Sequence, residues 1–374
     1  MSEFRLDRRA VLKTGLASAA FLAAPAIISS KALASSGEVK LISYAMNQQP
    51  ILDAFEKETG IKVKLSAITN DDEMFSQVKL GAGTAEAADL CEPASTNIPL
   101  WYGNGFLQAF DPSKLAVGNI TSGMPGTKEG DAGYQEGKLV YSSTLWGGEG
   151  MGYASDVQGH TFGEASLADI LDPAFVGQVT VRAHSALAAI GRILEAQGKL
   201  PKPFLDSYKD EAVMRANYDV IIAEAIKHKP NIAQFWTNDN EGNAAFTANG
   251  CRVGLIWESM GRVLADQGVR YIAPKEGVFG WNQGFVLLKG APNVEAAHAF
   301  VKYISQPENS AKWAAANQGL PSVKGAVDLM DDKSKAFTAA AYPGDAISKV
   351  WWWPPQDPWF IKLRGEYADK WRAA

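Results

Sequence analysis

The chain has 374 residues and a formal net charge of −5 at pH 7, with 36 basic and 41 acidic side chains. This balance argues against nucleic acid or an anionic membrane as a partner, and a chain of this length usually folds as two compact units. Two cysteines are present, Cys91 and Cys251. Each lies in or beside an apolar strand-like run, so we expect two buried free thiols rather than a disulfide.

The first 34 residues have the pattern of an export signal. Arg8 and Arg9 precede an apolar run, Leu16 to Ile28, and small residues follow at Ala32 and Ala34. A charged start, a short apolar middle and a small-x-small cut are typical of a secretory signal peptide, and the paired arginines indicate the twin-arginine export machinery. The alternative is a retained membrane anchor, but the run is shorter than the roughly 18–20 residues that span a bilayer. The sequence therefore predicts a twin-arginine signal peptide over 1–34, cleaved near Ala34, and a periplasmic mature protein.

After the signal, short β runs alternate with amphipathic helical segments. The first such stretch predicts strands at 39–44, 61–66 and 88–92 and helices at 49–59 and 71–80. The same alternation resumes after residue 176, with the following expected elements: strands at 177–181, 253–257 and 285–288, and helices at 186–197, 212–227, 261–268 and 294–305. This order is typical of an α/β protein whose sheets are mainly parallel and covered by helices.

Two extended, glycine-rich regions interrupt the alternation, at 140–153 and 269–284. Glycines near strand ends suit hinges or a close approach of the backbone to a ligand. We therefore expect two crossover strands that join two α/β lobes. Lobe 1 would comprise 35–147 with 277–325, and lobe 2 would comprise 148–276 with 326–374.

One segment carries a resemblance to a known family. The run Phe55-Glu56-Lys57-Glu58-Thr59-Gly60-Ile61-Lys62-Val63 resembles a segment of extracellular solute-binding proteins, in particular the branch that binds spermidine and putrescine. Leu145-Trp146-Gly147 with Met151-Gly152, Gly254 to Trp257, and Trp281-Asn282-Gln283 follow in the family's order. The resemblance implies a two-lobed periplasmic binding protein that closes on a small solute and docks on the permease of an ABC transporter. It implies no metal and no cofactor, and we expect a monomer.

Four tryptophans are candidates for ligand contact. Trp257 and Trp281 lie at strand ends, where ligands bind in α/β sheets, and Trp146 lies in the first crossover region. The run 351–353 contains three tryptophans, and because side chains alternate in an extended chain, at most one or two of them reach a cleft. We select Trp353 from this run. Ordinary core packing is the alternative for each of the four rings.

Polar candidates on lobe 1 follow its first and third strands. The turn after the first strand holds Tyr44, Met46 and Asn47, and the resemblance implies that this turn contacts ligand. Ser95 and Thr96 follow the third strand, where they could instead cap a helix.

On lobe 2, the resemblance implies carboxylates where this chain has Arg182 and His184, and an aspartate where it has Gln283. An arginine there would repel a polyamine and attract a carboxylate or phosphate, although a surface salt bridge is the alternative role. The remaining polar candidates near the cleft are Glu149, Glu258 and Gln356. Arg182 together with Glu149 or Glu258 would suit a zwitterion, so we expect a nitrogen-containing solute that is not a simple di- or triamine.

Other classes of function have less support. The four histidines form no metal-spaced pair, and the chain lacks a G-x-S-x-G elbow. The run Gly123 to Lys128 lacks the spacing of a phosphate loop, and Pro125 removes a backbone donor that such a loop would need. We therefore expect no enzyme. A ferric-ion receptor commonly uses adjacent tyrosines, which are absent, whereas a receptor for a sugar or sugar acid stays open as the alternative.

Overall fold

The computed structural model describes residues 37–44, 46–84 and 86–374. The predicted signal peptide, with its paired arginines and its cleavage site, lies outside the described residues. In the part of the chain that is described, none of the helices combines the length and the apolar character needed to cross a membrane.

One mixed sheet runs through the molecule in the order β2-β1-β3-β12-β7-β10-β8-β9. At one end, β1 (Glu38–Tyr44) pairs in parallel with β2 (Lys62–Ile68) and β3 (Leu90–Cys91). At the other end, β8 (Val179–Val181) pairs in parallel with β9 (Ile232–Phe235) and β10 (Val253–Trp257). The remaining strands of the chain are short: β4 (Leu107–Gln108), β5 (Tyr134–Gln135), β6 (Lys138–Leu139), β11 (Arg270–Ile272), β13 (Leu320–Pro321) and β14 (Trp351–Trp352).

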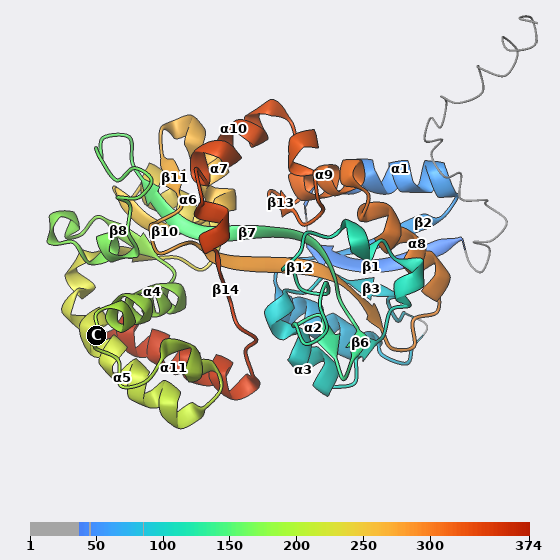
Figure 1. Ribbon diagram of the computed structural model, residues 1–374, viewed down its shortest axis with the longest axis horizontal. Coiled ribbons are helices and arrows are strands. Elements are labelled where there is room, and N and C mark those ends of the chain that lie inside the picture. Colours follow the sequence, from blue (N-terminus) through green and yellow to red (C-terminus); the bar gives the residue numbers. More distant parts are fainter. Residues whose placement is uncertain (1–36, 45, 85) are drawn as a thin grey trace, which may run out of the picture.

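Two long antiparallel strands join the two ends of the sheet. They are β7 (Ser142–Tyr153) and β12 (Phe279–Leu288), and Figure 1 shows them crossing the whole molecule. The region predicted as one extended segment, 269–284, is divided between β11 and β12. Gly277 separates the two strands because its φ is +86°, and a Cβ atom there would lie 1.9 Å from the carbonyl oxygen of Lys349.

The helices gather on the two ends of the sheet and so form two lobes (Figure 1). Lobe 1 contains α1 (Gln49–Thr59), α2 (Asp71–Gly81), α3 (Ile98–Gly103), α8 (Val294–Ile304) and α9 (Pro307–Ala316). Lobe 2 contains α4 (Ala183–Ala196), α5 (Glu211–Lys227), α6 (Asp239–Thr247), α7 (Glu258–Leu264), α10 (Asp332–Ala341) and α11 (Pro358–Ala373). The predicted α/β, two-lobed architecture is confirmed.

Local sequence explains where the first helices begin and end. Helix α1 ends at Gly60, whose φ of +74° gives the left-handed cap that a side chain would strain. Helix α2 begins after Asn70, whose side chain accepts a hydrogen bond from the backbone N–H of Glu73. That cap fixes the position of Asp71, the first residue of the helix, which is important for the site described below.

The glycines of β7 make room for aromatic side chains. A Cβ atom on Gly147 would lie 2.3 Å from the ring of Trp281, and one on Gly148 would lie 2.6 Å from the hydroxyl of Tyr342. The glycines of β7 lie outside the left-handed φ region. They therefore serve close packing rather than an unusual backbone conformation.

The two cysteines are buried and free, as predicted. Cys91 is 0% exposed and Cys251 is 2% exposed. Burial raises the pKa of each thiol. Both side chains therefore act as small apolar core residues.

Candidate functional site

Arg182 lies at the carboxyl end of β8, directly before α4. Its guanidinium carbon is 4.9 Å from the ring centroid of Trp257 and 6.0 Å from that of Trp236. Burial lowers the pKa of this guanidinium, and the charge of Glu149 opposes that effect. Among the described residues, none forms a hydrogen bond or an ion pair with the guanidinium of Arg182. An arginine that is largely buried and keeps its donors unused is a candidate anion-binding group.

Asp71 faces this arginine from lobe 1. It is the first residue of α2, and its carboxylate accepts hydrogen bonds from the hydroxyl of Tyr44 (2.7 Å) and from the backbone N–H of Ala94 (3.4 Å). Burial raises the pKa of Asp71, whereas the charge of Arg182 lowers it. The two opposite charges therefore interact across the space between the lobes. The sequence analysis did not select Asp71, although its place at a helix start beside the strand ends was a usable signal.

Glu149 faces Arg182 from the crossover strand β7. It is 1% exposed, and one carboxylate oxygen accepts a hydrogen bond from Ser185 at 2.8 Å. The other oxygen has no hydrogen-bond partner of ordinary geometry among the described residues, although the side chain of Trp257 lies close enough to lower the pKa of this carboxyl. Burial raises the pKa of Glu149 to about 7, although the charge of Arg182 acts in the opposite direction. A buried oxygen without a donor is a position that a ligand ammonium group could satisfy.

Asp239 is a third carboxylate near Arg182, and it was also not selected from the sequence. It begins α6 and accepts a hydrogen bond from Ser259 at 2.5 Å. Burial raises its pKa, and the charge of Arg182 opposes this shift. Three carboxylates from both lobes thus interact electrostatically with Arg182, and none of them forms an ion pair with it. A second buried guanidinium, that of Arg364, lowers the pKa of Arg182 and donates a hydrogen bond to the side chain of Gln356 at 2.6 Å.

The side of the cleft formed by lobe 1 brings several predicted residues together. Tyr44 is the last residue of β1, and its hydroxyl lies within hydrogen-bonding range of Gln283. Gln283 in turn forms an isolated β-bridge with Ala94. Ser95 and Thr96 follow directly after that bridge. The other two predicted members of the first turn, Met46 and Asn47, are exposed beyond the end of the strand.

A C-terminal segment contacts both lobes. The N–H of Gln356 donates to the carbonyl of Thr96 at 3.2 Å, which is a direct backbone contact between the lobes. Trp353 stacks on Phe279 with ring centroids 4.8 Å apart, and its ring lies 6.3 Å from that of His184. A cavity of about 230 Å³ lies here, bounded by Ser95 and Thr96 on one side and by 352–355 on the other.

Two predicted ligand contacts lie on the face of β7 that points away from Glu149. Trp146 is 4% exposed and packs against Tyr342 and Trp352. Glu258 is 0% exposed, and its carboxylate is held by Arg262 and by the hydroxyl of Tyr342, each at 2.6 Å. Because side chains alternate along a strand, Trp146 points away from Glu149. The structure therefore places Trp146 and Glu258 in a packed core instead of the cleft.

Trp281 is partly buried against lobe 1. Its ring fills the space above Gly147, and its indole nitrogen is buried without a partner among the described residues. It lies on the same face of the crossover strands as Glu149, since Gly147 and Glu149 are two residues apart on β7. Trp281 therefore remains beside the cleft as part of its floor.

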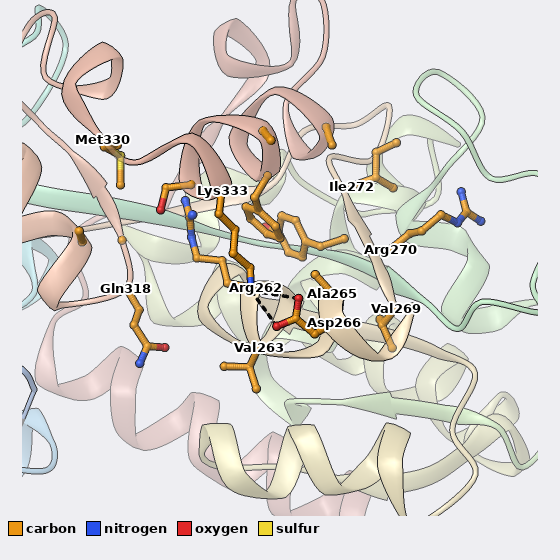
Figure 2. A pocket seen from close by; sticks show the side chains of 18 residues that line it. Arg262, Val263, Ala265, Asp266, Val269, Arg270, Ile272, Gln318, Met330 and Lys333 are labelled. Atoms are coloured by element: carbon orange, nitrogen blue, oxygen red, sulfur yellow. Dashed lines mark hydrogen bonds and ion pairs between the residues drawn. The ribbon is translucent and has the colours of Figure 1, made fainter.

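A groove of about 870 Å³ is lined by residues of α7, β11 and α10 (Figure 2). Its basic groups are already engaged: Lys333 pairs with Asp266 at 2.7 Å, and Arg262 pairs with Glu258. Size alone therefore does not identify the site: the unused guanidinium of Arg182 and the unpaired oxygen of Glu149 do not line this groove.

The comparisons with known proteins identify the family of this chain. A sequence model of the family described as bacterial extracellular solute-binding protein matches residues 51–342. The chain belongs to this family.

Individual relatives of this solute-binding protein are distant. It is 26% identical over 332 residues to spermidine/putrescine-binding periplasmic protein 1 of Haemophilus influenzae, a match that covers 87% of this chain and 85% of the relative. It is also 26% identical over 332 residues to the putrescine-binding periplasmic protein PotF of Escherichia coli, covering 83% and 84%. Among solved structures, the spermidine/putrescine substrate-binding protein PotD of Streptococcus pneumoniae has a TM-score of 0.71 at 19% identity, covering 90% of this chain and 98% of that one.

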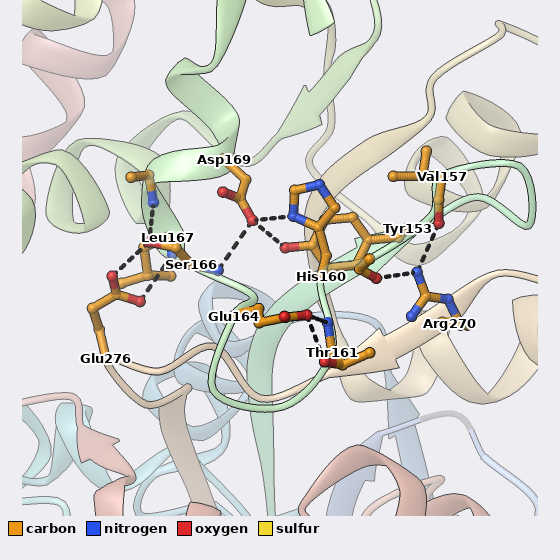
Figure 3. Close-up of polar contacts among 12 residues, drawn as sticks. Tyr153, Val157, His160, Thr161, Glu164, Ser166, Leu167, Asp169, Arg270 and Glu276 are labelled. Carbon is orange, nitrogen blue, oxygen red and sulfur yellow. Dashed lines mark hydrogen bonds and ion pairs between the residues drawn. The ribbon is translucent and has the colours of Figure 1, made fainter. Parts of the chain in front are cut away.

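A second polar cluster in this solute-binding protein is structural. Figure 3 shows Asp169 between the ring of His160 (2.9 Å) and the hydroxyl of Tyr153 (2.5 Å). The same carboxylate accepts a hydrogen bond from the backbone N–H of Ser166, and Glu276 accepts one from the hydroxyl of Ser166. These groups satisfy one another, so the cluster fastens the loop after β7 to lobe 2.

Proposed function

We propose that this chain is the periplasmic receptor of an ABC importer and that it captures a small nitrogen-containing solute. Membership of the solute-binding family supports the receptor role. Relatives named for spermidine and putrescine support a solute with amine groups. The receptor would deliver its solute to a membrane permease, and ATP hydrolysis would take place in other subunits. We assign it no catalytic role and no metal or cofactor.

The solute should carry an anionic group as well as an amine. The observation that supports this most strongly is Arg182, a largely buried guanidinium that uses none of its donors within the described chain. A guanidinium fork binds a carboxylate or phosphate through two parallel hydrogen bonds. The nearby carboxylates of Asp71 and Glu149 offer acceptors to an ammonium group. A zwitterion uses both kinds of group, whereas a simple polyamine leaves Arg182 buried against its positive charge.

Lobe closure is the mechanism that this arrangement supports. Asp71 belongs to lobe 1 and Arg182 to lobe 2, so a ligand that binds both stabilises the closed state by contacts that the open state lacks. We propose the boundaries expected from the sequence, 35–147 with 277–325 for lobe 1 and 148–276 with 326–374 for lobe 2.

Isothermal titration with putrescine, spermidine, 4-aminobutyrate, glutamate, glucose and glucuronate tests the proposal. Amino acid-type solutes should bind more tightly than diamines or neutral sugars. Tight binding of spermidine with none of the others would overturn the requirement for an anionic group. If none of the six binds, a thermal-shift screen with a broader set of metabolites would test the receptor role.

A sugar or sugar acid is the second candidate, and the aromatic rings give it less support. A sugar ring needs a free aromatic face. Arg182 covers one face of Trp257, Phe279 stacks on Trp353, and the ring of Trp281 lies against Gly147. Tight binding of glucuronate with no binding of 4-aminobutyrate would reverse this ranking.

Replacing Asp71 with asparagine should weaken binding of an amine-bearing solute by about 10- to 100-fold, because a hydrogen bond to a charged group contributes about 1.5–3 kcal/mol. Asp72→Asn is the matched control, since this neighbouring acid is exposed on the same helical turn. Titration calorimetry of both variants measures the difference. Equal affinities for the two variants would remove Asp71 from the site.

Export through the twin-arginine machinery is a further part of the proposal. Replacing both Arg8 and Arg9 by lysine should abolish accumulation of the protein in the periplasm, whereas Arg5→Lys should leave it unchanged.

Mass spectrometry of the periplasmic protein should find a chain that begins at Ser35. A protein that retains residues 1–34 would instead indicate an anchored form.

A further inference from the structure

Glu92 is a carboxylate buried at the end of β3, and it is 0% exposed. It accepts three hydrogen bonds, from the hydroxyl of Ser43 (2.7 Å), the hydroxyl of Thr144 (2.5 Å) and the indole N–H of Trp313 (2.8 Å). All three donors are neutral, and within the described residues no basic side chain pairs with Glu92. Burial raises the pKa of Glu92, and the three hydrogen bonds partly offset this shift.

A carboxylate in such a place needs an explanation beyond packing. Moving an ionised carboxylate out of water costs several kcal/mol, and a well-packed apolar residue is often as stable or more so. The neighbouring side chains of β3, Leu90 and Cys91, are apolar and fully buried. An apolar residue at position 92 would continue that core, so the fold alone does not require an acid there.

The three donors come from segments that build the lobe 1 side of the cleft. Ser43 directly precedes Tyr44, whose hydroxyl binds Asp71. Thr144 lies on β7, and its hydroxyl is also 3.1 Å from the carbonyl oxygen of Gln283 on β12. One carboxylate thus connects the turn that carries Tyr44 with both crossover strands.

A second layer of contacts extends this connection. The side-chain amide of Gln48, just before α1, donates to Ser43 at 3.1 Å and to Asn317 at 2.9 Å. Asn317 follows α9, the helix that carries Trp313. The turn after β1 is therefore fixed from two sides, and both sets of contacts include Ser43.

We propose that Glu92 is a positioning residue for the solute site. It holds the turn of Tyr44 against β7, so that lobe 1 presents Tyr44, Asp71 and Gln283 together when the lobes close. Glu92 touches no solute itself and acts through Ser43 and Thr144. This role rests on the proposed function, because it concerns the same cleft.

The chain contains a matched control at the other end of the same strand. Asp89 is also 0% exposed and also accepts three hydrogen bonds, from the backbone N–H of Lys40 (2.7 Å) and from the backbone and side-chain N–H groups of Asn293 (2.7 and 3.0 Å). Its partners lie away from Tyr44 and from the crossover contact. Glu92→Gln and Asp89→Asn therefore remove the same kind of charge from equally buried places.

Titration calorimetry with 4-aminobutyrate and putrescine as probes separates positioning from stability. Both variants should lower the unfolding temperature, but only Glu92→Gln should weaken binding of the better probe, by tenfold or more, while Asp89→Asn stays within twofold of the wild type. Thr144→Val should shift affinity in the same direction, and its effect should not add to that of Glu92→Gln, because both changes break one contact. Equal affinities of Glu92→Gln and Asp89→Asn would overturn the proposal.

Hydrogen exchange of the full, ligand-free chain gives a second result that needs no solute. Glu92→Gln should increase exchange at 43–48 and 142–146 by at least tenfold, and Asp89→Asn should do so at 38–41 and 291–293 instead. If the wild type binds neither probe, the solute assignment fails while exchange still tests the contacts of Glu92. Unchanged exchange at 43–48 in Glu92→Gln would contradict the positioning role.

Discussion

Replacing Arg182 with alanine should weaken binding of an amino acid-type solute by about 30- to 5,000-fold, because truncating one partner of a buried charge pair costs about 2–5 kcal/mol. The same change should strengthen binding of putrescine, since it removes one of two nearby cations, Arg182 and Arg364. The carboxylates of Asp71, Glu149 and Asp239 remain. The change also removes the stacking of Arg182 on aromatic rings and its attraction to the buried carboxylates, so the unfolding temperature should fall as well. Titration calorimetry with 4-aminobutyrate and putrescine measures both affinities.

Arg192→Ala is the control for this selectivity switch. Arg192 lies on the same helix, and its guanidinium lies 5.6 Å from the ring centroid of Phe279. Its donors bind the carbonyls of Glu276 (2.5 Å) and Gly277 (3.4 Å), so it has a structural role that Arg182 lacks. Arg192→Ala should lower the unfolding temperature and leave the ratio of the two affinities unchanged. If Arg182→Ala leaves that ratio unchanged as well, Arg182 does not select the solute.

Replacing Glu149 with glutamine should make the protein more stable at pH 8 by up to about 3 kcal/mol, with little effect at pH 4.5. Burial raises the pKa of Glu149 from 4.5 to about 7, so the folded state disfavours its ionised form. The stability that this group contributes is fully present below pH 4.5 and is lost as the pH rises through 7. Urea unfolding of both proteins between pH 4.5 and 8 measures the effect.

The pH dependence has a control of opposite sign and a consequence for binding. Hydrogen bonds from Thr237 lower the pKa of Glu241, so Glu241→Gln should not reproduce the gain at pH 8.

An ammonium group beside Glu149 favours its ionised form, so solute binding near pH 6 should release protons. Calorimetric titrations in buffers with different ionisation enthalpies measure the number of protons released. A pH-independent difference between wild type and Glu149→Gln would show that Glu149 ionises normally.

The sequence predicted most strands of the main sheet and several of the larger helices because their side-chain periodicity is local, but it missed β9 and the long helix α11. The helix predicted at 49–59 matches α1, and the predictions for α2 and α8 differ from the structure by a single residue at the C-terminal end. The single extended region expected at 269–284 was wrong because Gly277, in a left-handed conformation, starts a new strand. Periodicity does not report such a break.

The site was harder to predict, for reasons that differ between residues. Trp146 and Glu149 are three positions apart on one strand, so alternation alone already places them on opposite faces. Asp71, in contrast, becomes a site residue only through tertiary contacts with Tyr44 and the charge of Arg182, which are distant in sequence. Glu258 is an acid directly after a strand, which is a common place for a ligand contact. Its carboxylate forms an ion pair with Arg262, one helical turn later, and is therefore not free to bind a solute.

The place of α11 in lobe 2 constrains the order of events during biosynthesis. Phe360, Leu363, Tyr367 and Trp371 of this helix are part of the same apolar core as β8 and α4. Lobe 2 therefore cannot complete its core until synthesis has passed through α11, long after β8 and α4 have been made. A chain without α11 would leave the apolar faces of β8 and α4 exposed, so lobe 2 depends for its folding on the described helix farthest from both elements in the sequence.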